Sequence, residues 1–314
     1  MHSARRPFVA LGLVVAALAA CERPAEQQRR DTTAVAPPAP PETAAAPVAE
    51  PTWDAGVGPA LVVHDASGDE TYVIGSPVGA PSGDTTDAAS AIHGDTLDLF
   101  TPAGTVGRVI VTATSDREPQ GARCTAWPSA DLRATGAEPL PADWTVAFVS
   151  GTVRPLPLAP IESMASADSA RLAAELTRLA SAIPDSARSP FTGLPFVVRS
   201  AYRFSPARGR VAVVADLVRK LNLEASPLEE HTLLIAERDS AQPQSRLQTV
   251  YRERTSASEE RVVSTEVLAA IEVAGDRRTE LVLARVGYDS TAYALLERSP
   301  GGVWRLRWTS ARGC

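Results

Sequence analysis

The sequence predicts a mainly β protein of the α+β class, in which antiparallel sheets and one prominent helix follow a disordered tether. Over most of residues 59–314, short apolar runs alternate with clusters of Gly, Asp, Ser and Pro, a pattern typical of antiparallel sheets. One segment near residues 166–183 instead carries its apolar residues at helical spacing. Hydrophobic residues make up 44% and charged residues 22% of the 314 residues, which excludes a multi-span membrane protein and a wholly disordered chain.

Residues 1–21 have the order of parts typical of an export signal. Arg5 and Arg6 form a positive segment, and residues 8–20 form an apolar stretch too short to span a bilayer, which takes about 20 residues. The stretch ends in Leu18-Ala19-Ala20-Cys21, and with it the segment resembles the signal peptide and lipobox of bacterial lipoproteins. The resemblance implies cleavage before Cys21 and acylation of Cys21. An ordinary signal peptide followed by a chance cysteine is the alternative.

This resemblance predicts a location in the cell envelope. Glu22, rather than an aspartate, follows Cys21, which in bacterial lipoproteins favours the outer membrane, facing the periplasm or the surface. Removal of residues 1–20 takes away two arginines and no acidic residue, so the net charge changes from −6 to −8. An acidic chain lacks the basic stripe that nucleic acid requires. The expected partners are the lipid bilayer, through acylated Cys21, and another envelope protein.

Residues 21–58 are expected to form a tether. Residues 22–58 contain seven prolines and nine alanines, and so too little large apolar surface to offset the entropy of ordering. The run Pro37-Pro38-Ala39-Pro40-Pro41 favours polyproline II, which makes a semi-rigid spacer. We therefore expect the tether to hold a folded body away from the lipid surface.

The folded part is expected to begin with a β region at residues 59–160 and a helical connector at residues 161–190. Strands are predicted at residues 61–63, 72–74, 97–100, 106–112 and 144–149, in an antiparallel sheet or a small sandwich. The helix rests on the spacing of its apolar residues and on the proline that ends it, namely Leu172, Leu176, Leu179, Ile183 and Pro184. Ser166 or Asp168 is the expected N-cap.

The last region, residues 191–314, is predicted to be an antiparallel β region with longer strands. They are expected at residues 196–204, 211–221, 232–238, 247–254, 261–273, 280–286, 291–298 and 303–310. Residues 211–221 also fit a helix, but their β-branched residues favour a strand. Alternation places Val263, Val267, Ile271 and Val273 on one face of their strand. It likewise places Trp304, Leu306 and Trp308 together on one face of the final strand.

Part of this region resembles a repeat family. Residues 276–283 (Asp-Arg-Arg-Thr-Glu-Leu-Val-Leu), the tyrosine-bearing strand after them and Gly-Gly-Val-Trp-Arg are similar to FG-GAP or VCBS repeats, over about residues 267–309. The resemblance implies a strand–turn–strand unit of a β-propeller with a calcium loop at Asp276 and Glu280. Arg277 and Arg278 stand where that loop would carry further acidic residues, so we expect no calcium and no other cofactor.

No local motif predicts a catalytic or metal site. A phosphate-binding loop, a dinucleotide fingerprint and a Gly-x-Ser-x-Gly elbow are all missing, and no two histidines of the mature chain have metal-ligand spacing. His93 is expected in an exposed turn, with a role as a general base as the alternative. His231 is expected at a solvated hairpin end, with a pH-sensitive switch as the alternative.

Two cysteines remain once Cys21 is acylated. Cys124 and Cys314 form an even pair in an oxidising compartment, which predicts a disulfide bond between them. Two free buried thiols are the alternative.

These observations together predict a membrane-anchored envelope lipoprotein that acts as a binding or structural module rather than as an enzyme. The alternative is a lipoprotein hydrolase whose site is assembled from distant Ser, His and carboxylate residues. A deep pocket with His93 or His231 beside a serine or a carboxylate would favour the hydrolase.

Overall fold

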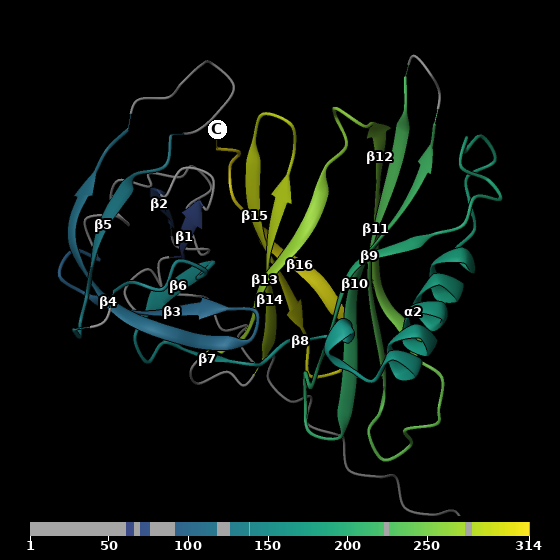
Figure 1. Cartoon of the computed structure of the whole chain (residues 1–314), viewed down its shortest axis with the longest axis horizontal. Helices are drawn as coiled ribbons and strands as arrows, with labels where there is room; N and C mark the ends of the chain where they lie inside the picture. The colour runs from purple at the N-terminus through teal and green to yellow at the C-terminus, as the bar shows by residue number, and fades with distance from the viewer. Residues whose placement is uncertain are drawn as a thin grey trace, which may run out of the picture. The chain divides into compact units, whose positions relative to one another are not determined.

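The computed structural model describes residues 61–65, 70–75, 92–117, 126–137, 139–222, 226–273 and 278–313 (Figure 1). The protein is mainly β, with antiparallel sheets and a single α-helix in this described part, as the sequence predicts. The chain divides into two compact units, Met1–Ala49 and Glu50–Cys314, and every described residue belongs to the second. None of the helices described is long and apolar enough to cross a membrane. The signal segment, the tether and all three cysteines lie outside the described residues.

The first six strands form a closed antiparallel barrel. They are β1 (Leu61–Asp65), β2 (Glu70–Gly75), β3 (Thr96–Thr101), β4 (Gly104–Ser115), β5 (Ser129–Ala134) and β6 (Val146–Val149). The order around the barrel is β1-β2-β5-β4-β3-β6, and β6 closes it by pairing with both β3 and β1. The predicted antiparallel pairing is confirmed, but the strands close into a barrel instead of forming a small sandwich. The sequence did not predict closure, because β5 (SADLRA) has no apolar run and was not predicted as a strand. Without β5, β2 and β4 have no strand between them.

Two five-stranded antiparallel sheets follow the barrel. The helix-side sheet has the order β12-β11-β10-β9-β8, and the central sheet has the order β16-β15-β14-β13-β7. Their strands are β7 (Val153–Pro155), β8 (Ala159–Pro160), β9 (Val197–Phe204), β10 (Arg210–Leu221), β11 (Leu228–Asp239), β12 (Gln248–Ser258), β13 (Ser264–Val273), β14 (Thr279–Val286), β15 (Thr291–Arg298) and β16 (Trp304–Thr309). Residues 211–221 thus form a strand, as their β-branched residues predict.

The central sheet is buried on both faces. On one face, Leu281 and Leu296 pack with Val214 and Ile235 of the helix-side sheet in an inter-sheet core. On the other face, residues of β13, β14 and β15 pack against the outside of the barrel, where they meet Leu61, Val63 and Phe148, among others. The barrel has a further apolar core of its own that includes Leu97, Leu99 and Val109.

The helix α2 (Ser166–Ser181) covers the outer face of the helix-side sheet, after a short 3-10 helix η1 (Ile161–Ser163). Leu172 and Leu176 are buried against that face, as the helical spacing predicts. The predicted N-cap is wrong, because Ala165 occupies the cap position and no side chain caps the helix. Ser166 is the first residue of the helix itself.

Two β-bulges overturn the predicted face assignments. The register of β13 against β14 shifts between Val267 and Ala269, so Val267 packs in the inter-sheet core while Ile271 faces the barrel. The register of β15 against β16 shifts in the same way. Trp304 therefore lies in the inter-sheet core and Trp308 packs on the barrel side. An extra residue in one strand reverses the alternation beyond it, and the sequence pattern does not show where it occurs.

Candidate functional site

The strongest candidate site is a buried cluster of ionisable side chains on β10 and β11. Asp216 continues the inter-sheet row of Ala212 and Val214, and His231 continues the row of Leu233. The imidazole of His231 lies between two carboxylates: Nδ1 is 3.1 Å from Oδ2 of Asp216, and Nε2 is 3.2 Å from Oε2 of Glu229. All three residues are buried.

Further charged groups surround this cluster. Lys220 forms an ion pair with Glu229, and its Nζ also lies 3.6 Å from Glu259. On the other side, Arg199 of β9 lies 3.2 Å from Asp216 and 3.5 Å from Glu266 of β13. The cluster therefore joins three strands of the helix-side sheet to the start of β13 in the central sheet.

The charges set the protonation of the cluster. Burial lowers the pKa of His231, but the hydrogen bond and charge of Asp216, together with Glu229, outweigh it and raise the pKa overall. For Glu229 the effects have the opposite signs: burial raises its pKa, but Lys220 and His231 outweigh burial and lower the pKa overall. Each ring nitrogen lies within hydrogen-bond distance of a carboxylate oxygen, and the raised pKa of His231 favours the doubly protonated ring, which can donate to both. The cluster is a histidine ring held between two carboxylates.

This arrangement decides what His231 does chemically. A general base needs one unprotonated ring nitrogen that faces a substrate or a nucleophile. Both nitrogens of His231 instead face carboxylates, and the residue is only 6% exposed. The predicted solvated hairpin end is wrong, because the strand extends back to Leu228 and takes His231 into the sheet.

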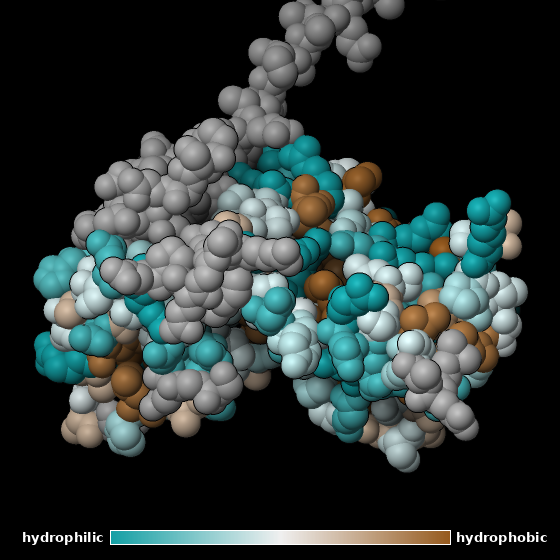
Figure 2. Space-filling model, turned by 90° about the horizontal axis from the view of Figure 1, so that it is seen from above, coloured by the Kyte–Doolittle hydropathy of each residue, from teal (hydrophilic) through white to brown (hydrophobic). Residues whose placement is uncertain are grey.

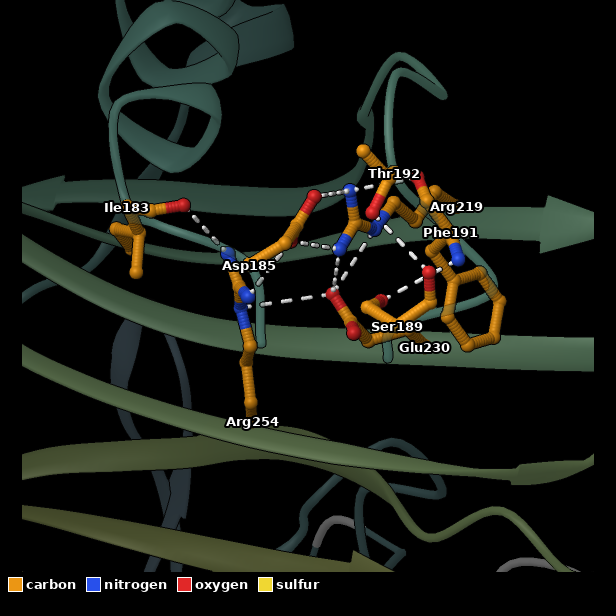
Figure 3. A network of polar contacts seen from close by, with 8 residues as sticks. All are labelled: Ile183, Asp185, Ser189, Phe191, Thr192, Arg219, Glu230 and Arg254. Carbon is orange, nitrogen blue, oxygen red and sulfur yellow. Dashed lines mark hydrogen bonds and ion pairs between the residues drawn. The ribbon is translucent and has the colours of Figure 1, made fainter. Parts of the chain in front are cut away.

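A second buried network centres on Arg219, on the helix side of the same two strands (Figure 3). Its guanidinium donates to Asp185 at 2.5 and 3.2 Å, to Glu230 at 2.9 Å and to the carbonyl oxygen of Phe191 at 3.0 Å. It also lies 4.6 Å from the ring centroid of Phe196. The network fastens the segment that follows α2 onto the sheet.

Arg254 of β12 completes this network from the neighbouring strand. It donates to Asp185 at 3.0 Å and to the carbonyl oxygen of Ile183 at 3.2 Å, and its Nε lies 3.5 Å from Glu230. The hydrogen bond from Arg219 is the main reason why the pKa of Asp185 is lowered, and Arg254 contributes as well. Asp185 is thus held as a carboxylate between two guanidinium groups.

A third network lies inside the inter-sheet core. Glu237 of β11 accepts hydrogen bonds from Arg298 of β15 at 2.7 and 2.8 Å, and from Nε1 of Trp304 at 2.7 Å. Glu237, Arg298 and Trp304 are all buried. The carboxylate thus accepts three hydrogen bonds, two of them from one bidentate guanidinium. This network therefore joins the two sheets and does not form a ligand site.

Sequence reasoning missed all three networks, although one signal was available. Arg219-Lys220 and Glu229-Glu230 have opposite charges on two neighbouring strands, and the observed register pairs Arg219 with Glu230 and Lys220 with Glu229. A search for charge complementarity across that hairpin would have found the register and the two networks near it.

The other predicted residues lie apart from these networks. His93 is in an exposed turn, as predicted. His64 stacks on Trp144, with ring centroids 4.9 Å apart. Glu280, which the repeat resemblance assigns to a calcium loop, is buried beside Arg307, while Asp276 lies outside the described residues.

The face of the described part that is seen from above in Figure 2 is mostly polar. Figure 2 shows hydrophilic side chains over much of the face seen from above, with hydrophobic side chains singly or in small groups between them. The large apolar side chains that are exposed belong to separate elements: Val106, Leu140, Val197, Tyr288, Val303 and Leu306. Within the described ranges, no three His, Cys, Asp or Glu side chains are placed to hold a metal ion.

Comparison with known proteins adds no relative: no protein-family model, no curated protein and no solved structure matches this chain.

Proposed function

We propose that this chain is a lipid-anchored envelope lipoprotein whose folded body serves as a binding or structural module. The observation that carries the proposal is the order of segments at the N-terminus, in which a positive segment and an apolar stretch end in Leu18-Ala19-Ala20-Cys21. Several acyl chains on Cys21 would give stable anchoring, at about 0.8 kcal/mol for each buried methylene. The outer membrane, facing the periplasm or the surface, is the proposed location.

Cys21→Ser tests the anchor. The variant removes the acylated residue, so its mature chain should leave the membrane fraction in a wash at 300 mM NaCl, whereas the acylated parent should stay. Mass spectrometry of the parent should show the acyl groups on Cys21. Membrane retention of the variant, together with a parent that carries no acyl mass, would contradict the proposal.

The geometry of His231 supports a module without catalysis. The hydrolase alternative needs a histidine with a free nitrogen beside a nucleophile, whereas Asp216 and Glu229 occupy both nitrogens of His231. A screen of the purified chain against ester, amide and glycoside substrates separates the two functions. Turnover that His231→Gln abolishes without loss of folding would favour the hydrolase.

The proposed disulfide Cys124–Cys314 gains support from the described residues next to each cysteine. Gly313 pairs with Thr291, and a Cβ placed on Gly313 would overlap the ring of Trp127. The Trp127 ring is also 5.3 Å from that of Tyr293, centroid to centroid. The chain on either side of the proposed bond is thus in contact, since Trp127 is three residues after Cys124 and Gly313 directly precedes Cys314.

Thiol titration tests the disulfide. The oxidised mature chain, denatured without reductant, should expose no thiol from Cys124 or Cys314, and two after reduction. Cys124→Ser and Cys314→Ser should each leave one free thiol and lower the melting temperature. Two titratable thiols in the protein isolated from an oxidising compartment would refute the bond.

A further inference from the structure

Five arginines gather at one end of the helix-side sheet. Arg203 lies near the end of β9, Arg208 and Arg210 belong to the β9–β10 turn and the start of β10, Arg238 lies near the end of β11, and Arg246 lies in the loop before β12. The turn and the loop are at the same, lower end of the sheet in Figure 1.

Backbone pairing places these arginines close together. Arg210 is opposite Asp239 and Val211 is opposite Arg238, so the ends of β10 and β11 are in register. The amide of Ser240 donates to the carbonyl oxygen of Gly209 at 3.0 Å, which joins the β9–β10 turn to the end of β11. The side chain of Arg238 reaches the carbonyl oxygen of Ser245 at 3.5 Å, beside Arg246. Arg203 is opposite Val213 of β10, so all five positions lie at one end of the sheet, which we call the arginine end.

The arginine end carries positive charge that the protein does not neutralise. Among the described residues, none of its five arginines forms an ion pair, and all except the half-buried Arg238 are exposed. Asp239, the last residue of β11, accepts a hydrogen bond from the amide of Ala241. On α2, Glu175 faces the loop and accepts from the amide of Leu247. Two carboxylates leave an excess of positive charge there, although the chain as a whole has a net charge of −6.

We propose that the arginine end docks on anionic phospholipid headgroups and so orients the anchored body on its own membrane. The proposal rests on the lipid anchor proposed above. A guanidinium donates two parallel hydrogen bonds to a phosphate, which makes arginine well suited to phosphodiester headgroups. Each arginine close to an anionic membrane surface strengthens partitioning by about fivefold.

The anchor and the tether explain why a membrane is the partner. Residues 22–58 span no more than about 130 Å even when fully extended, so a body anchored at Cys21 stays near the bilayer at high effective concentration. Charges interact strongly with the headgroups only within the Debye length, about 8 Å at physiological salt. The acidic remainder of the body therefore turns away while the arginine end faces the lipid. Docking would fix orientation, whereas the acyl chains provide retention.

Vesicle sedimentation tests docking separately from anchoring. The probe is the full mature chain with Cys21→Ser, mixed with vesicles of equal parts phosphatidylglycerol and phosphatidylcholine, or of phosphatidylcholine alone, at 50 and 300 mM NaCl. Binding is expected only on the anionic vesicles and should weaken at 300 mM. Arg208→Gln/Arg210→Gln should reduce the partition coefficient roughly 25-fold, the product of two fivefold effects.

The matched control is Arg133→Gln/Arg188→Gln, which removes two exposed arginines from β5 and from the loop after α2. It should bind as the parent does, and melting curves should be the same for all three proteins. If Arg208→Gln/Arg210→Gln melts earlier, Arg203→Gln/Arg246→Gln takes its place. Docking would be overturned by an equal loss of vesicle binding in the control. It would also be overturned by binding that does not change with salt, or by no binding to the anionic vesicles. Membrane fractionation of the acylated chain would still decide the anchor.

Discussion

Replacement of Arg219 by methionine should destabilise the protein strongly. Arg219 has a side chain that is only 3% exposed, and the variant loses its hydrogen bonds to Asp185, Glu230 and the carbonyl oxygen of Phe191. Glu230, with a 7% exposed side chain, then has Arg254, at 3.5 Å, as its one ionic partner among the described residues. Breaking a buried ion pair by removing one partner costs about 3–5 kcal/mol.

The loss should appear both globally and locally. For a chain of this size, 1 kcal/mol shifts the melting temperature by about 2 °C, so Arg219→Met should melt roughly 6–10 °C earlier. Hydrogen exchange should also become faster in residues 183–196, because Arg219 and Arg254 fasten this segment to the sheet. Arg219→Lys keeps the positive charge but loses the planar guanidinium that donates several hydrogen bonds at once. Its melting temperature should therefore lie between those of the parent and Arg219→Met.

The matched control is Arg171→Met. Arg171 pairs with Asp168 on the exposed side of α2, where an ion pair contributes little. Its melting temperature should stay within about 1 °C of the parent, and exchange in residues 183–196 should not change. If Arg219→Met melts within 2 °C of this control, the buried network does not stabilise the fold and the reasoning fails.

Three further changes test other features. Because the pKa of His231 is raised in the folded protein, its contribution to the free energy of unfolding is complete below about pH 6.5, the unfolded pKa, and is lost as pH rises through the folded pKa. Urea unfolding at pH 6 and 8.5 should show this loss of stability, and His231→Gln should remove the difference between the two pH values. Glu237→Gln should cost about 3 kcal/mol by leaving the Arg298 guanidinium without a carboxylate, measured by urea unfolding against the exposed-site control Glu260→Gln. Gly313→Ala should lower stability by about 1–3 kcal/mol, because its Cβ would overlap the Trp127 ring, and a melting temperature equal to that of the parent would disprove this contact.

The sequence predicted the elements that local pattern determines. The strand at residues 291–298 and the helix that begins at Ser166 have the expected extents to within a few residues, because the strand is a continuous apolar run between turns and the helix keeps helical spacing throughout. The pattern failed where a bulge interrupts it, as in β13 and β16, and where a strand such as β5 has no apolar run. Barrel closure depends on pairing between β1 and β6, about 80 residues apart, which no local pattern specifies.

The buried polar clusters were harder to predict for a related reason. Asp216 and His231 are 15 positions apart and meet only once the register of β10 and β11 is known. Asp185 reaches Arg219 across 34 positions, from a loop with no periodicity. Charged residues in strands are usually solvated, so the sequence predicted that His231 is exposed to solvent. The pairing of β10 with β11 shows that it is enclosed.

The burial of the central sheet on both faces also constrains the order in which the protein can fold as it is synthesised. The barrel ends at Val149, yet the residues that cover its outer face, such as Ile271, Val282 and Leu295, are added more than 100 residues later. Until then Leu61, Val63 and Phe148 remain open to water, at a cost of about 25 cal/mol for each Å² of apolar surface. A nascent chain truncated before β13 should therefore be sensitive to proteases and dependent on a chaperone that binds apolar surface. The C-terminal strands complete the burial of the barrel's outer face.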